Sequence, residues 1–220
     1  PEDRIVSRGW QLSLPTPVKK QLKEYHVAVW ADADWACVDD RLVSAAEAVA
    51  KALEKTGAKV DRSARLPSFD AKANLAMYNN LSAANFAVKM QGLPKEANLP
   101  NYRKAQEDRE LLRDKWELFF AKYDVLICPS YPSLAFPKIE QEPDFRKRTL
   151  RIKRDGKEID VPYLRALLWA YLTTTAHLPS TTFPCGVCQE TGLPVGLNVV
   201  SREYNDLICI DVVRLLQEEC

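Results

Sequence analysis

Glycine is scarce in this sequence. Only seven of the 220 residues are glycine, and none of them flanks a serine in a Gly-x-Ser-x-Gly or Gly-Gly-Ser pattern. Nucleophilic serines and bound phosphates are commonly served by backbone N–H groups in glycine-rich turns. The sequence therefore contains neither the nucleophile turn of an α/β-hydrolase nor a phosphate-binding loop of the common kinds.

Histidines and metal-ligand motifs are equally scarce. His26 and His177 are the only histidines, and the one Cys-x-x-Cys motif, Cys185–Cys188, precedes a turn between two predicted strands. A redox motif places its first cysteine at a helix N-terminus, and a zinc site needs further ligands. We therefore predict no metal and no cofactor. The six cysteines fit reduced thiols of a cytoplasmic protein, and a Cys-x-x-Cys redox protein is one alternative.

Neither sign of charge dominates, and long apolar runs are missing. There are 31 basic and 30 acidic residues, which gives a formal net charge of +1. No global field attracts nucleic acid or an anionic membrane, and no apolar run approaches the roughly 20 residues of a membrane span. We therefore expect neither partner. The length predicts a single domain over residues 1–220, in which residues 1–22 form an extended lead-in segment.

The apolar pattern indicates alternating strands and helices. Asp39–Lys55 has helical spacing, an aspartate cap and Gly57 as its end. Strands at Tyr25–Trp30 and Ala58–Val60 flank it, which favours a parallel crossover. The other predicted elements are helices over Ser68–Met90 with Ser68 as cap, Pro100–Lys122, Pro162–Thr175 and Asp206–Glu219, strands over Asp124–Cys128, Ser180–Phe183 and Leu193–Val200, and a hairpin over Thr149–Val161. The predicted fold class is α/β, with a mixed, mostly parallel sheet covered by helices.

One stretch places polar groups just before a predicted strand. Trp169, Thr173 and His177 precede the strand that follows Pro179. In open α/β sheets ligands gather at strand ends and loops, so these side chains are candidates for a substrate pocket. A core tryptophan followed by a polar helix end is the alternative interpretation.

Four segments, in order, resemble the amidase signature hydrolases. Val38-Asp39 and Leu53–Val60 are similar to that family's Val-Asp, helix and Leu-Glu-x-x-Gly-Ala-x-Val unit. Tyr123–Pro132 resembles its Tyr-Asp-x-Leu-Leu-x-Pro-Thr-x-Pro segment, and a hairpin with Asp155-Gly156 follows. Leu178–Asn198 resembles its last segment, which runs from Leu-Pro through Pro-x-Gly to Gly-Leu-Pro-x-Gly-Leu-Gln. The resemblance covers most of the chain and corresponds to the C-terminal half of the family's fold.

The resemblance implies an amide hydrolase whose Ser–cis-Ser–Lys triad lies in the preceding half. Since none of those residues has a counterpart here, no catalytic residue is assigned, and we expect this chain to be an inactive C-terminal portion by itself. Its implied role is scaffold and pocket wall for a small-molecule amide. Tyr131 then joins Trp169, Thr173 and His177 as substrate-binding residues. Apolar core left uncovered would lead to self-association.

Two departures from the family's pattern leave the substrate class open. Asn198 stands where glutamine is common, and Thr173–His177 replaces an asparagine-bearing approach to Leu-Pro. A non-catalytic scaffold or interaction protein, derived from the same half, is the alternative function.

Overall fold

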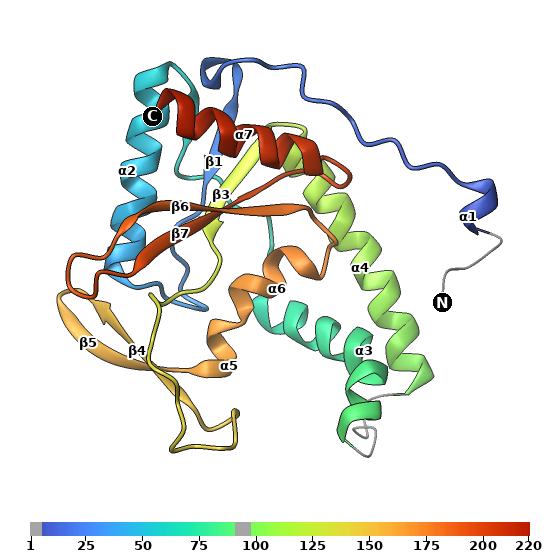
Figure 1. The fold of residues 1–220 in the computed structure, drawn as a ribbon. Helices are drawn as coiled ribbons and strands as arrows, with labels where there is room; N and C mark the ends of the chain where they lie inside the picture. Colours follow the sequence, from blue (N-terminus) through green and yellow to red (C-terminus); the bar gives the residue numbers. More distant parts are fainter. Residues whose placement is uncertain (1–5, 91–97) are drawn as a thin grey trace.

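A computed structural model describes residues 6–90 and 98–220 and places a five-stranded sheet at the centre, in the order β2-β1-β3-β7-β6 (Figure 1). β1, β2 and β3 are parallel, whereas β7 runs against β3 and β6 runs against β7. Four of the five strands therefore point the same way, which confirms the mixed, mostly parallel sheet. The strands are β1 (His26–Val29), β2 (Lys59–Asp61), β3 (Val125–Pro129), β6 (Ser180–Val187) and β7 (Pro194–Val200), and a separate hairpin pairs β4 (Thr149–Arg154) with β5 (Lys157–Pro162).

Helices cover this sheet and one another. α7 packs against β6 and β7, α2 packs against β3 and β7, and α3 packs against α4 and α6. The helices are α1 (Val6–Gly9), α2 (Asp40–Thr56), α3 (Ala71–Met90), α4 (Leu99–Phe120), α5 (Tyr163–Ala166), α6 (Leu168–Thr174) and α7 (Asp206–Glu219). The main core combines buried side chains of the sheet with those of α2, α4, α6 and α7.

The lead-in segment lies largely outside this core. Residues 10–20 form neither helix nor strand, and Figure 1 shows them leaving the body of the fold to reach α1. Trp10 and Val18 are 81% and 82% exposed. The predicted limits of a single domain over 1–220 stay a prediction. Within the described ranges, no helix combines the length and the apolar character needed to cross a membrane.

The strand–helix–strand unit β1-α2-β2 follows the sequence closely. The Asp39 carboxylate accepts a hydrogen bond from the Arg41 N–H, and Gly57 ends the helix with φ +93° in the left-handed region. β1 and β2 then pair in parallel, as predicted. Both ends of α2 lie one residue later in the chain than predicted, within the usual uncertainty of helix ends.

The start of α3 differs from the prediction. Ser68 has φ +52° and is not the cap; instead the Asp70 carboxylate accepts hydrogen bonds from the N–H groups of Lys72 and Ala73. An aspartate nearer the helix satisfies the free N–H groups that Ser68 was expected to serve.

β6 is longer than predicted. The expected strand ends before Pro184, but pairing with β7 continues to Val187, with a register shift between Pro184 and Gly186. Proline is tolerated here because β6 is the edge strand of the sheet. Proline has no N–H to donate, and the β-bulge at this point shifts the register so that pairing resumes at Gly186.

The hairpin predicted over Thr149–Val161 forms, whereas the helix predicted after it is divided. The hairpin turn has φ +51° at Asp155 and +73° at Gly156, as a two-residue turn of this kind requires. Leu150, Ile152, Val161 and Ala166 form a second, smaller core. The single helix predicted over Pro162–Thr175 is divided at Leu167 into α5 and α6.

Candidate functional site

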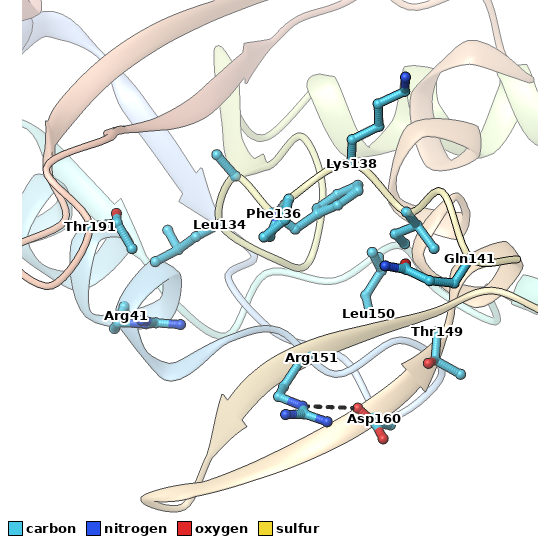
Figure 2. Close-up of a pocket in the computed structure, with 13 residues that line it drawn as sticks. Arg41, Leu134, Phe136, Lys138, Gln141, Thr149, Leu150, Arg151, Asp160 and Thr191 are labelled. Atoms are coloured by element: carbon cyan, nitrogen blue, oxygen red, sulfur yellow. Dashed lines mark hydrogen bonds and ion pairs between the residues drawn. The ribbon is translucent and has the colours of Figure 1, made fainter.

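Two hollows lie at the ends of the sheet. The proline-loop hollow has a volume of about 460 Å³ and lies between the loop 134–141, the β4-β5 hairpin, Arg41 and Thr191 (Figure 2). The strand-end hollow has a volume of about 560 Å³ and is formed by the loops that follow β1 and β2. Its lining residues are Trp30, Asp32, Ala33, Asp34, Trp35, Arg65, Leu66, Ser68 and Phe69.

The proline-loop hollow combines apolar walls with charged groups that are already paired. Leu134, Phe136 and Leu150 supply apolar surface. Figure 2 shows Arg151 and Asp160 of the hairpin joined by an ion pair, with 3.3 Å between Nε and Oδ1. The charges of this hollow are therefore used mainly within the protein itself.

A buried carboxylate next to this hollow joins two elements. Asp39 is 0% exposed; its carboxylate accepts hydrogen bonds from Arg41 Nε and Nη2 at 2.8 and 2.7 Å and from the Lys153 N–H at 2.9 Å. Burial by itself raises the pKa of Asp39, but these donors outweigh burial, so that the pKa lies below its ordinary value. Asp39 thus holds the β4-β5 hairpin against the start of α2.

The floor of the strand-end hollow is a cluster of aromatic rings. Trp30 lies 6.0 Å from both Trp35 and Phe69 between ring centroids, and Trp35 lies 5.6 Å from Phe69. Trp169 of α6 backs this cluster, with its ring 4.8 Å from that of Trp35. Edge-on and tilted contacts of this kind are favourable and fix the rings.

None of the four predicted pocket residues lines both hollows, and two of them lie next to one hollow each. Trp169 is buried, and its Nε1 donates to the Ala36 carbonyl at 2.8 Å, so it supports the strand-end hollow from below. Tyr131 is half-buried behind the proline-loop hollow, with its ring 6.1 Å from that of Phe136. Burial raises the pKa of Tyr131.

Thr173 and His177 face neither hollow. Thr173 is buried in α6, and its hydroxyl lies 3.5 Å from the Ala170 carbonyl. His177 is exposed, has φ +59°, and places Nε2 3.2 Å from Arg109 Nη1. Partial burial, followed by the charges of Arg109 and Arg113, lowers the pKa of His177.

Three residues of the strand-end hollow were not singled out from the sequence: Trp35, Arg65 and Phe69. Trp35 and Arg65 belong to loops that follow the two strands of the predicted parallel crossover. The carboxyl ends of neighbouring parallel strands meet at one edge of a sheet. The predicted parallel crossover could therefore have indicated that these two loops lie side by side.

Asn198, which departs from the family's glutamine, and Cys185 of the Cys-x-x-Cys motif both have hydrogen-bond partners within the protein. The Asn198 side-chain oxygen accepts hydrogen bonds from the Ser130 hydroxyl at 2.6 Å and from the Thr182 hydroxyl at 2.7 Å. Cys185 donates from Sγ to the Val195 carbonyl at 3.4 Å, and burial raises its pKa. All six cysteines are free thiols. In residues 6–90 and 98–220, no group of three potential ligands is placed to hold a metal ion.

Solved structures of an amidotransferase and of an amidase share this fold. The chain superposes on the A subunit of glutamyl-tRNA(Gln) amidotransferase from Thermotoga maritima with a TM-score of 0.69, 19% identity, and coverage of 99% of this chain and 48% of that one. It superposes on a bacterial aryl acylamidase of the amidase signature enzymes with a TM-score of 0.67, 16% identity, and coverage of 89% and 43%. These likenesses establish the fold.

The sequence establishes the family. The sequence model of the Amidase family matches residues 87–210, so this chain belongs to the Amidase family. Among curated relatives, the A subunit of glutamyl-tRNA(Gln) amidotransferase from Macrococcus caseolyticus is 23% identical over 94% of this chain and 47% of its own length. Its counterpart from Rippkaea orientalis is 34% identical over 46% of this chain and 18% of its own length. The matched part of this chain thus corresponds to about half of the length of the first of these relatives and to less of the second.

Proposed function

We propose that this chain is the C-terminal part of an amide hydrolase and provides scaffold and substrate-pocket wall. The observation that carries the proposal is the Amidase family match over residues 87–210. In addition, 94% of this chain aligns with a curated relative, but the alignment covers only 47% of that relative. The remaining half would supply the Ser–cis-Ser–Lys triad that the family resemblance implies. That serine would attack the amide carbonyl, form an acyl-enzyme and release an amine or ammonia.

Four serine hydroxyls of this chain are hydrogen-bonded to groups other than a lysine, which fits the division of labour. Those of Ser82, Ser130 and Ser201 donate to Tyr78, Asn198 and Asp124 respectively, and that of Ser63 donates to Asp61. The buried Ser133 hydroxyl has no hydrogen-bond partner among the described residues.

The proline-loop hollow is the part of the pocket wall that we assign to this chain. Leu134, Phe136 and Leu150 would pack against the apolar part of a small-molecule amide, and Tyr131 would hold Phe136 from behind. Trp169 would act on the wall indirectly, by fixing the Ala36 segment. The roles of Thr173 and His177 as substrate contacts stay predictions, and so does the cytoplasmic location.

Exposed apolar side chains support the proposal that another polypeptide packs against this chain. Trp10, Leu12 and Val18 of the lead-in segment are each more than 70% exposed. β6 is an edge strand whose outer side has no neighbour among the described residues. Both features would be covered by the other half of the hydrolase or, in the isolated chain, by self-association.

Turnover assays test the proposal. Simple aryl and aliphatic amides are offered to the isolated chain and to a complex of the chain with the N-terminal half of an Amidase family relative. We expect no turnover by the chain alone and turnover by the complex. Clear turnover by the isolated chain would contradict the assignment.

The non-catalytic scaffold is the alternative. A reading frame upstream of this chain that encodes a lysine and a Gly-Gly-Ser-Ser-like segment favours the hydrolase, whereas a stop codon there favours the scaffold.

A further inference from the structure

The strand-end hollow occupies a position where α/β proteins commonly bind ligands. It opens at the carboxyl ends of β1 and β2, which are parallel neighbours. Its lining residues all come from the two loops that follow these strands. In open α/β sheets, the carboxyl ends of parallel strands and the loops after them are a usual place for a ligand.

The loop after β1 is held in place by bonds to the rest of the protein. The Asp32 carboxylate accepts from the Val38 N–H at 3.0 Å and from Arg154 Nη2 at 2.6 Å. Arg165 donates to the carbonyls of Asp34 and Trp35, at 2.8 and 2.5 Å. These bonds fix the backbone on both sides of Trp35, so its ring is presented to the hollow in a preorganised position.

The walls of the hollow offer aromatic surface to a ligand. Trp30 is buried, but Trp35 and Phe69 are only partly covered, and both line the hollow. Their rings meet each other at 61°, with 5.6 Å between centroids. A flat ring that enters the hollow would therefore gain edge or face contacts with two aromatic side chains at once.

A guanidinium group provides a polar contact at the same place. Arg65 lies over the Trp30 ring at 5.4 Å, and its Nη1 donates to the carbonyls of Ala64 and Arg62. Its Nε and Nη2 have no hydrogen-bond partner among the residues that the structure describes. Since these two groups form one bidentate edge, Arg65 can donate two hydrogen bonds to a single oxygen-bearing group.

The rim contains a strained residue. Ser68 lines the hollow with φ +52°, a region that non-glycine residues seldom occupy. Such strain persists where surrounding structure enforces it and is frequent at ligand sites. It adds a backbone feature to the aromatic walls and the free donors.

We propose that the strand-end hollow binds a planar aromatic group that carries a carbonyl oxygen, with the ring against Trp35 and Phe69 and the oxygen on Arg65. The proposal goes beyond the hydrolase role, because binding needs only residues of this chain and no nucleophile.

Ligand-observed NMR titration of the 220-residue chain with benzamide tests it. We expect saturable binding of benzamide, and binding about tenfold weaker for cyclohexanecarboxamide, which keeps the amide but lacks the aromatic face. Equal affinity for the two probes, or no saturation by benzamide, would overturn the proposal.

Variants locate the binding. Trp35→Ala should weaken benzamide binding about tenfold and Arg65→Met several-fold, while Trp10→Phe, on the exposed lead-in segment, should leave it unchanged. Circular dichroism checks the fold, and Trp35→Leu replaces Trp35→Ala if the latter unfolds. Unchanged benzamide affinity in a folded Trp35 variant would contradict the proposed site. The binding result does not depend on the outcome of the turnover assay.

Discussion

The two hollows differ in what their charged groups do. Around the proline-loop hollow, Arg41, Asp39, Glu190 and Lys153 form a connected set of ion pairs, so the charges hold α2, the β4-β5 hairpin and the β6-β7 loop together. In the strand-end hollow, Asp32 is paired with Arg154, but Arg65 keeps two N–H donors free above an aromatic floor. Charge near a cavity therefore indicates a ligand site only where it is not already consumed by the fold.

Among the changes considered, removal of the Asp39 carboxylate should lower stability the most. Asp39→Ala leaves Arg41 and the Lys153 N–H without their buried acceptor, so we expect the free energy of unfolding to fall by about 3–5 kcal/mol. Urea denaturation followed by circular dichroism measures it. Asp114→Ala, on the exposed face of α4, is the control and should change little. A loss as small as that of the control would show that the paired set does not hold the fold.

Trp169→Phe should lower both the stability of the protein and the benzamide affinity of the strand-end hollow. The variant removes ring volume and leaves the buried Ala36 carbonyl without its donor, which we expect to lower the free energy of unfolding by about 2 kcal/mol. Benzamide affinity should fall too, because Trp35 loses its support. Lost stability with unchanged affinity would mean that Trp169 belongs to the core alone.

Acid should remove the contribution of Asp39 to stability. The pKa of Asp39 in the folded chain lies below its ordinary value of 3.8. The carboxylate therefore stabilises the fold fully above that value, and the stabilisation is lost as the pH falls through the lowered folded-state pKa. Unfolding measured from about pH 6 down to about pH 2 should show a shallower loss in Asp39→Asn than in the unchanged chain. Parallel curves would contradict this role of Asp39.

Glu190→Gln should give the smallest effect. Glu190 bridges Arg41 at 2.7 Å and Lys153 at 2.5 Å, but its side chain is 51% exposed, and exposed ion pairs contribute little. We expect overall stability close to that of the unchanged chain, with faster hydrogen exchange confined to the amides of the β4-β5 hairpin. Unchanged exchange there would show that the bridge is incidental.

The difference between the two helical regions shows how far sequence reasoning reaches. α2 was predicted with its cap and its glycine end because those signals are local: the Asp39 carboxylate accepts from the Arg41 N–H two residues on, and Gly57 supplies a left-handed backbone. The helix over Pro162–Thr175 was predicted as one piece because its apolar pattern is continuous. Its division at Leu167 follows from packing on two different cores.

Local chemistry in the sequence was thus enough to determine the strand and helix order, the hairpin turn at Asp155-Gly156, the α/β class and the family. Only the tertiary structure decided the sites. It placed Tyr131 behind the proline-loop hollow and Trp169 behind the strand-end hollow, and it brought Trp35, Phe69 and Arg65 from two loops to one hollow. The physical reason is that periodicity and caps act over a few residues, whereas a site depends on which strand ends become neighbours in the folded sheet.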